Sequence, residues 1–391
     1  MKLSRTIKTA LIILLFPIAL TAQESGKARK WTLNGHLQNL GTLWVQDWDG
    51  RWQTMNQVKN RFDFRWYPLN GLSLHIGMRN NFTFGMIPQM YYPFIADLSV
   101  IDPGYLDLTR LVAKDTSYYA TSNLDRLNIT YTYGKFQATI GRQRINWGIS
   151  YVWTPNDIFN TFDYFDFDYV ERPGCDAVHL QYYTGATSSV EAAVKLDSRE
   201  RLTMAGMYRF NKRNYDFQFL GGYMTGDYVI GAGWSGSIRG AGFTGEMSYF
   251  HPEEKFADTS GIYMASIGAN YTFRNSLLLQ FEGLYNSDGT NGPAGMGASF
   301  FVNREISAKS FTLARFSLFG NISYPITPLF TASLAAMFNP DDMSVFTGPT
   351  LNFSLTSNIE FMVTGQLFFG DPGTEFGDYG KLAYARLKWN F

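Results

Sequence analysis

The sequence predicts an all-β transmembrane barrel of about eighteen antiparallel strands, with sixteen as the alternative count. Side-chain polarity alternates with a period of two along most of the 391 residues, which is the signature of strands with two different faces. Aromatic residues make up 17% of the chain and charged residues also 17%, well below the roughly 25% charged residues of soluble domains. Beyond the N-terminal region no apolar run reaches the roughly 18 residues of a membrane-spanning helix.

The N-terminal region has the pattern of a secretory signal peptide. Lys2, Arg5 and Lys8 precede the apolar run TALIILLFPIAL, which is shorter than the roughly 20 residues of a spanning helix. We therefore expect a signal peptide over residues 1–22, cut after Ala22, and no lipoprotein anchor because no cysteine lies nearby. A short periplasmic segment, 23–30, would then precede a barrel over 31–391.

Cysteine content and net charge exclude other classes. Cys175 is the single cysteine, so the chain is not a secreted fold held by internal disulfides. The formal net charge is zero, which gives no indication of nucleic-acid binding. No His and Cys spacing predicts a metal site and no phosphate-binding loop is present, so we expect neither metal nor cofactor.

Each candidate strand is recognised by its alternation. In LSLHIGMRNNFTF, Leu72, Leu74 and Ile76 share one face, whereas Ser73 and His75 share the other. Equivalent runs begin near Trp31, Val58, Leu72, Asn123, Phe136, Asp176, Ser188, Leu202, Tyr215, Tyr228, Ala241, Gly261, Leu277, Phe311, Leu329, Val345, Ile359 and Lys381.

The connections fall into two classes. Short turns such as NG at 70–71, YGK at 133–135 and SN at 357–358 follow every second strand. Longer connections, at 86–122, 149–174, 251–260, 287–309 and 371–380, alternate with them. This asymmetry predicts short periplasmic turns and long extracellular loops, with the last strand closing on the first.

Aromatic residues near the strand ends predict two interfacial girdles. The residues are Trp31, Trp66, Tyr133, Tyr271, Tyr324 and Trp389 at the turn side, and Trp44, Phe84, Trp147, Tyr285 and Phe369 at the loop side.

The C-terminal stretch KLAYARLKWNF alternates up to a final aromatic residue. It resembles the C-terminal strand of Gram-negative outer-membrane β-barrels, which their assembly machinery reads. The residues that carry the resemblance are Tyr384, Leu387, Trp389 and Phe391. It implies an outer-membrane location, with membrane lipid, lipopolysaccharide and the assembly machinery as partners, and leaves an oligomer open.

The stretch GRQRINWG, followed by TPNDIFN, is similar to porin-like outer-membrane families, including alginate-export-type channels. Within residues 136–180 the match consists of Gly141, Arg142, Gln143, Trp147, Gly148, Pro155 and Asp157, whereas Thr154 stands where those families favour Asn. The polar and apolar faces also exchange at Gly141, which predicts either a β-bulge there or a strand that leaves the membrane.

The inward parity of the predicted barrel is largely polar. The expected pore-lining residues are Lys59, Arg61, Asp63, Arg65, His75, Arg79, Arg126, Arg142, Arg144, Glu191, Arg209, Glu246, Glu282, Arg315, Glu360 and Arg386. The basic members concentrate on the early strands. They either favour anions or simply form pairs with acids inside the wall.

Two long loops are candidates for constricting the lumen. The stretch NDIFNTFDYFDFDYVERPG and its flank contribute Trp153, Asp157, Asp163, Asp166, Asp168 and Glu171. Its simplest interpretation is an outer loop with an aromatic anchor; the alternatives are a fold-back into the pore and Ca²⁺ binding by carboxylates. The other loop, 86–122, contains LDLTRLV, for which we expect a short helix.

These features favour passive diffusion of small hydrophilic solutes, among them anionic or saccharide solutes. An outer-membrane lipid hydrolase or acyltransferase is the first alternative, with His251, Ser248 and Glu253 or Glu254 as its conceivable residues. A closed structural or binding barrel is the second. Energised transport is not expected, because the segment before the first strand is too short for a plug domain.

Overall fold

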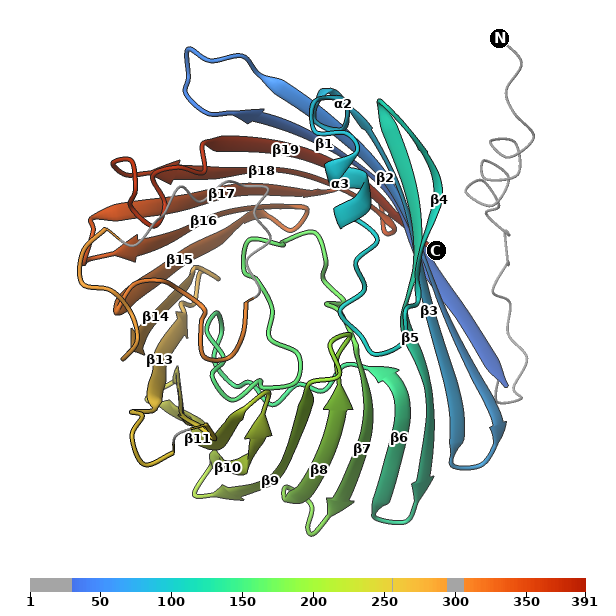
Figure 1. Ribbon diagram of the computed structural model, residues 1–391, viewed down its shortest axis with the longest axis vertical. Coiled ribbons are helices and arrows are strands. Elements are labelled where there is room, and N and C mark those ends of the chain that lie inside the picture. The colour runs from blue at the N-terminus through green and yellow to red at the C-terminus, as the bar shows by residue number, and fades with distance from the viewer. Residues whose placement is uncertain (1–29, 255, 294–305) are drawn as a thin grey trace.

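The computed structural model describes residues 30–254, 256–293 and 306–391, and its strands form a ring around a central loop (Figure 1). The expected signal peptide and almost all of segment 23–30 lie outside the described residues. The strands are β1 (Trp31–Val45), β2 (Gln53–Leu69), β3 (Leu72–Gly85), β4 (Thr109–Asp115), β5 (Tyr118–Tyr133), β6 (Phe136–Gln143), β7 (Cys175–Tyr183), β8 (Ser189–Leu196), β9 (Leu202–Lys212), β10 (Tyr215–Met224), β11 (Asp227–Ile238), β12 (Ala241–Pro252), β13 (Ile262–Thr272), β14 (Leu278–Asn286), β15 (Phe316–Thr327), β16 (Phe330–Asn339), β17 (Ser344–Ser354), β18 (Ile359–Phe369) and β19 (Lys381–Asn390).

The ring is a closed barrel. Each strand pairs antiparallel with its neighbour, and β19 pairs with β1 in a register that runs from His36 opposite Asn390 to Val45 opposite Lys381. β4 pairs only with β5, so eighteen of the strands in the described residues form the wall. The prediction of an eighteen-stranded antiparallel barrel is confirmed, and the count of sixteen is wrong. Closure leaves no strand edge unpaired in the membrane.

Alternate residues along each strand face different surroundings. On β7, for example, Val178, Leu180 and Tyr182 are exposed on the outside, while Cys175 and Ala177 are buried. A band of exposed apolar side chains on the outside with polar groups inside is typical of a transmembrane barrel. None of the helices in the described residues is long and apolar enough to cross a membrane.

The predicted girdles are correct in most positions. Trp31, Trp66, Tyr133, Tyr271 and Tyr324 are exposed at the turn side, as are Phe84, Tyr285 and Phe369 at the loop side. Two loop-side members were wrongly assigned. Trp44 lies on the inward parity of β1, is buried and donates its indole N–H to Tyr379 O. Trp147 follows the end of β6 and is buried against Phe159 and Glu191.

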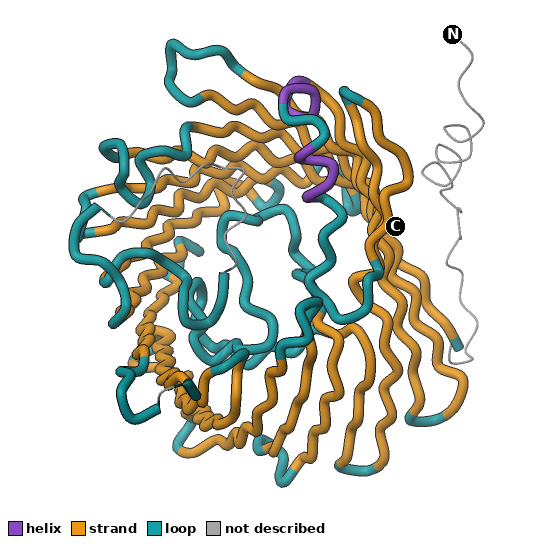
Figure 2. The backbone as a smooth tube through the Cα atoms, viewed as in Figure 1, coloured by secondary structure: helices purple, strands orange, loops and turns teal. Residues whose placement is uncertain are grey.

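Loop 86–117 differs from the expectation. Its helices are α2 (Met86–Met90) and α3 (Phe94–Leu98), which lie at the rim of the ring (Figure 2). The helix expected for LDLTRLV is wrong, because most of that stretch is β4 or the residues that lead into it. β4 pairs with β5 over Thr109–Asp115, where β5 extends beyond the end of β6.

β6 leaves the wall early, at Gln143. No register shift interrupts its pairing with β5 or β7, so the bulge expected at Gly141 is absent from these ladders. Instead Gly141 has φ of +111°, and a Cβ there would meet Leu127 O at 2.2 Å. This backbone conformation, which favours glycine, redirects the chain and accounts for the exchange of faces that the sequence shows.

Arg142, near the end of β6, joins this strand to β7 and to the segment before β4. Its guanidinium donates to Asp102 Oδ2 at 2.8 Å and to both Asp176 oxygens at 2.8 and 2.7 Å, and its side chain is only 3% exposed. Asp102 belongs to the segment before β4, whose Gly104 bridges to Asp197 after β8. Burial opposes ionisation of Asp102, but hydrogen bonds from Arg142 and from Gly104 N–H lower its pKa overall. Arg142 therefore lies within the wall and not on the expected pore lining.

Candidate functional site

Residues 144–174, named here the lumen loop, lie inside the ring of strands (Figures 1 and 2). The interpretation as an ordinary outer loop is therefore wrong, and the fold-back alternative describes the structure. The loop has two arms. The first arm, 144–160, contacts the wall from β8 to β15, and the second arm, 161–174, contacts β15 to β19 and then β1 to β5.

The first arm is held by polar side chains of the wall. Trp147 donates its indole N–H to Glu191 Oε2 at 3.0 Å and accepts a hydrogen bond from Gln218 at its carbonyl. Glu246 and Glu282 accept hydrogen bonds from backbone N–H groups between residues 149 and 156. Trp153 packs edge-on against Phe319 of β15, with ring centroids 6.5 Å apart. These contacts place the arm flat against the inner face.

The second arm is held by aromatic contacts and ion pairs. Phe165 packs against Phe346 of β17 and Phe368 of β18, and its carbonyl accepts from Gln366 at 2.7 Å. Farther along, Asp168 accepts from Lys59 at 2.6 Å and Arg386 at 3.3 Å. The arm thus joins β19 and β2 across the closure of the barrel.

The basic cluster predicted for the early strands is mostly paired with acids. Arg61 contacts Asp125 and, at 3.2 Å, Asp63, which also accepts from Arg65 at 3.3 Å. His75 Nε2 lies 3.0 Å from Asp63. Of the two alternatives for this cluster, pairing inside the wall therefore describes most of its members.

Two members of this cluster have other partners. Arg79 stacks on Tyr169, with its guanidinium carbon 3.5 Å from the ring centroid. Arg126 donates to the carbonyls of Glu171 and Arg172. Both arginines therefore fasten the end of the second arm to the wall.

The remaining pore-lining candidates lie at scattered positions. Arg209 donates to Gln218 at 3.3 Å within the wall, and Arg144 donates to Asn146 at the start of the lumen loop. Arg315 precedes β15 at the outer rim and contacts Gly289 O. Glu360 is exposed near the turn before β18. The site residues therefore do not form one cluster: some hold the lumen loop, and others lie away from it.

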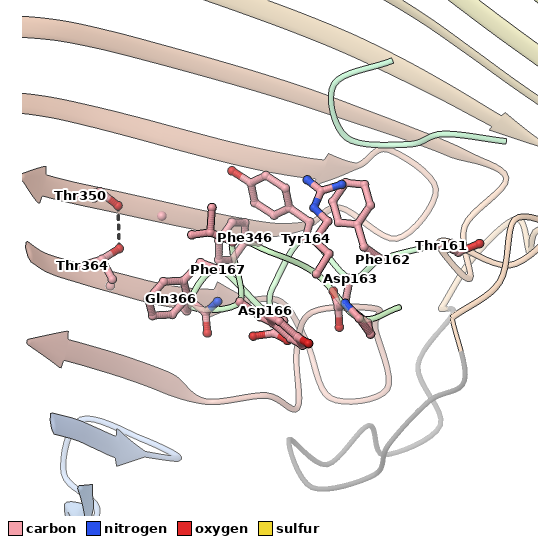
Figure 3. Close-up of a pocket in the computed structure, with 16 residues that line it drawn as sticks. Thr161, Phe162, Asp163, Tyr164, Asp166, Phe167, Phe346, Thr350, Thr364 and Gln366 are labelled. Atoms are coloured by element: carbon pink, nitrogen blue, oxygen red, sulfur yellow. Dashed lines mark hydrogen bonds between the residues drawn. The ribbon is translucent and has the colours of Figure 1, made fainter. Parts of the chain in front are cut away.

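A cavity of about 480 Å³ lies between the second arm and strands β17 and β18 (Figure 3). Loop residues Phe162, Tyr164, Phe167 and Tyr169 supply aromatic rings, and Asp163, Asp166 and Arg172 supply charges. The wall contributes Phe346, Gly348, Thr350, Thr364, Gly365 and Gln366, of which Thr350 and Thr364 are hydrogen-bonded at 2.6 Å. Volumes of this size are typical of small-molecule sites.

Burial changes the ionisation of several groups in the lumen loop. It raises the pKa of Asp157, which is fully buried, from 3.8 to about 6. It raises the pKa of Tyr164 to about 12 and that of Tyr169 further. Burial among neighbouring groups also raises the pKa of Asp166, a residue that keeps accessible surface in the cavity.

The acidic residues of the loop do not gather as a calcium site would require. Asp168 and Glu171 face bases of the wall, Asp157 is enclosed by the first arm, and Asp163 caps the N–H of Phe165. Within the described residues, no three His, Cys, Asp or Glu side chains are arranged to hold a metal ion.

Several wall residues that hold the loop were missed from the sequence. Gln38, Gln218, Ser248 and Gln366 lie on inward parities, but neutral side chains of this kind occur throughout the barrel. Asp125 was missed for another reason. The β3–β5 register skips it, so this bulge turns both Asp125 and Arg126 away from solvent, where strict alternation would separate them.

No protein-family model matches the sequence, and no curated protein sequence matches it either. Solved structures do match in fold. OccAB4 of Acinetobacter baumannii has a TM-score of 0.57 at 8% identity, with 94% of this chain and 100% of that chain covered. OccD3 (OpdP) of Pseudomonas aeruginosa has 0.58 at 9%, covering 95% and 93%, and OprD of the same species has 0.56 at 10%, covering 95% and 97%. These are Gram-negative outer-membrane porins, so this chain has a porin-like barrel fold.

Proposed function

We propose that this protein is an outer-membrane channel for the passive diffusion of small hydrophilic solutes. The observation that carries the proposal is the lumen loop, which lines the inside of a closed barrel on both arms instead of covering it from outside. A loop in this place narrows a water-filled barrel without adding chemistry, since selectivity then follows from the size and the polar groups of the narrowed path.

Among the solute classes expected, the cavity favours neutral, polyhydroxylated molecules such as saccharides over anions. Aromatic rings of the second arm offer flat apolar faces, and Asp166 offers a carboxylate for hydroxyl groups. A strong anion preference needs uncompensated bases, whereas Lys59, Arg61 and Arg386 all contact carboxylates.

The test uses the full purified chain in two assays. In planar bilayers we expect discrete current steps that grow with salt concentration, and in liposomes we expect uptake of small sugars faster than of anions of equal size. A protein that inserts and folds but gives neither steps nor uptake would leave the closed structural or binding barrel as the better proposal.

The alternative of a barrel enzyme has less support. Ser248 is buried on the inward face of β12 and donates to Pro155 O, whereas His251 lies on the other parity of that strand. The ring nitrogens of His251 lie 2.8 Å from Tyr249 OH and from Phe256 O. Glu253 accepts from Tyr223 instead. Lipid hydrolysis by the purified protein would reverse this preference.

We further propose the membrane partners that the C-terminal resemblance implies. Leu387 of β19 and Phe391, which follows this strand, are exposed on the outside, where lipid, lipopolysaccharide and the assembly machinery have access to them. Tyr384 points inward, donating to Gln366 at 2.8 Å, so its contribution to an assembly signal is indirect. An oligomer remains a proposal to be tested by mass in detergent.

A further inference from the structure

Two glutamates on the inner wall have the backbone of the first arm as their hydrogen-bond partner. Glu246 of β12 accepts from the N–H groups of Ile149, Ser150 at 2.5 Å and Asn156 at 2.9 Å. Glu282 of β14 accepts from Tyr151 at 2.8 Å, Val152 at 3.0 Å and Trp153 at 2.7 Å. Five consecutive N–H groups of the chain, from 149 to 153, therefore converge on two carboxylates.

This arrangement is specific for carboxylates. Both oxygens of each side chain are used, and the side chains are nearly inaccessible, at 1% exposure for Glu246 and 3% for Glu282. Within the described residues no lysine, arginine or histidine forms an ion pair with either carboxylate. A carboxylate is an acceptor at every position, so it matches an array of N–H donors that have no other acceptor inside the lumen.

The strand ladders do not depend on these side chains. Glu246 pairs through its backbone with Gly233 and Ser266, and Glu282 pairs with Gly268 and Phe319, in registers without shifts at these positions. A substitution that preserves size at either position therefore leaves the wall intact and alters only the attachment of the first arm.

We propose that Glu246 and Glu282 are positioning residues that fix the first arm against the wall and thereby set the width of the conducting path. This inference rests on the proposed channel function and assigns the control of its aperture to two side chains that touch no solute. Loss of either carboxylate releases the arm into the lumen, where it fluctuates across the path.

The test compares E246Q and E282Q with wild type in single-channel recordings. Glutamine has the same shape, but one carboxylate oxygen becomes an amide donor that faces an N–H group of the arm. Because hydrogen bonds to charged groups are among the stronger ones, we expect the occupancy of displaced loop states, seen as flicker and altered conductance, to rise about 10-fold or more.

E200Q is the matched control, because Glu200 is exposed in the connection between β8 and β9, outside the wall, and its side chain forms no hydrogen bond among the described residues. We expect E200Q to behave as wild type. Heat-modifiable migration in gel electrophoresis reports barrel folding separately from conduction. If a glutamine variant does not fold, E246D or E282D replaces it, since aspartate keeps both acceptor oxygens but withdraws them by one methylene.

The outcomes separate the two proposals. Wild type without current steps overturns the channel function itself. Wild type that conducts, together with folded E246Q and E282Q variants whose flicker and conductance equal those of E200Q, overturns the positioning role while the channel function stands.

Discussion

At the scale of single residues, Asp157 is a buried acid for which burial outweighs the attraction of the nearby cations Arg144 and Lys195. Its Oδ2 has no hydrogen-bond partner, and burial raises its pKa from 3.8 to about 6. Because its pKa is higher in the folded than in the unfolded protein, folding favours the protonated form of Asp157. The resulting contribution to stability is complete below about pH 3.8 and is lost as pH rises through about 6. The first arm should therefore be held less firmly at pH 8 than at pH 4, by up to about 3 kcal/mol.

The corresponding measurement is open-channel noise between pH 4 and pH 8. We predict that noise rises with pH in wild type and that D157N, which cannot ionise, removes this component. Other carboxylates of the lumen also titrate, so the difference between the two proteins carries the information. Equal pH profiles would show that Asp157 does not control the arm.

The ion pairs of Arg142 allow the cost in stability of an unpaired buried charge to be measured. R142M leaves Asp102 and Asp176 buried without their cation, and removing one partner of a buried pair typically costs about 3–5 kcal/mol. We predict a loss of this size in urea unfolding of the vesicle-inserted barrel. The triple variant R142M/D102N/D176N should recover much of the loss. R142M with wild-type stability would mean that segment 102–108 is held by other contacts.

At the scale of elements, strands were predictable and the lumen loop was not. The period of two located all eighteen wall strands, with starts displaced by at most five residues, because each strand by itself has one face toward lipid and one toward the lumen. The fold-back of the lumen loop depends on partners such as Glu246, Glu282 and Asp168, which lie on distant strands or have meaning only in the folded chain. Alternation gave no information about these pairs.

The ion pairs between Asp168 of the second arm and the wall lead to a prediction on ion selectivity. D168N removes the carboxylate that Lys59 and Arg386 share, leaving two bases uncompensated beside the path. Unit charges 4 Å apart in water interact by about 1 kcal/mol, a factor of about five, so we expect the anion-to-cation permeability ratio to rise by roughly that factor. Reversal potentials in a salt gradient measure it.

D115N provides the control for this experiment. Asp115 lies exposed at the end of β4, where its carboxylate caps the N–H of Thr116 and contacts no lumen base. D115N changes the net charge of the protein by the same amount as D168N. If the effect of D168N is local, D115N leaves the permeability ratio unaltered. If the permeability ratio shifts similarly in both variants, the cause is the net charge of the protein and not the ion pairs of Asp168.

At the scale of the whole molecule, the sequence predicted which site residues face the lumen but not which of them contact one another. The inward face of the strands was assigned correctly for residues such as Lys59 and Arg61, but their pairing with Asp168 and Asp125 was not. The exchange of faces at Gly141 was visible in the sequence, whereas the insertion of segment 102–115 beside β5 was not. Local patterns specify which solvent a residue meets, and closure of the barrel decides which distant residues meet each other.

The outward face gives the most direct test of the whole architecture. Ile267 lies midway along β13 with 52% exposure, a surface that in a water-soluble protein would accept lysine without cost. Lysine facing the middle of a bilayer costs about 2–4 kcal/mol in a barrel wall, so I267K should lower the stability of the vesicle-inserted protein by that amount in urea titrations. M343K, at a residue 71% exposed in the connection before β17, should change stability by no more than about 0.5 kcal/mol. Equal small effects for both variants would show that the apolar face of the barrel does not contact lipid.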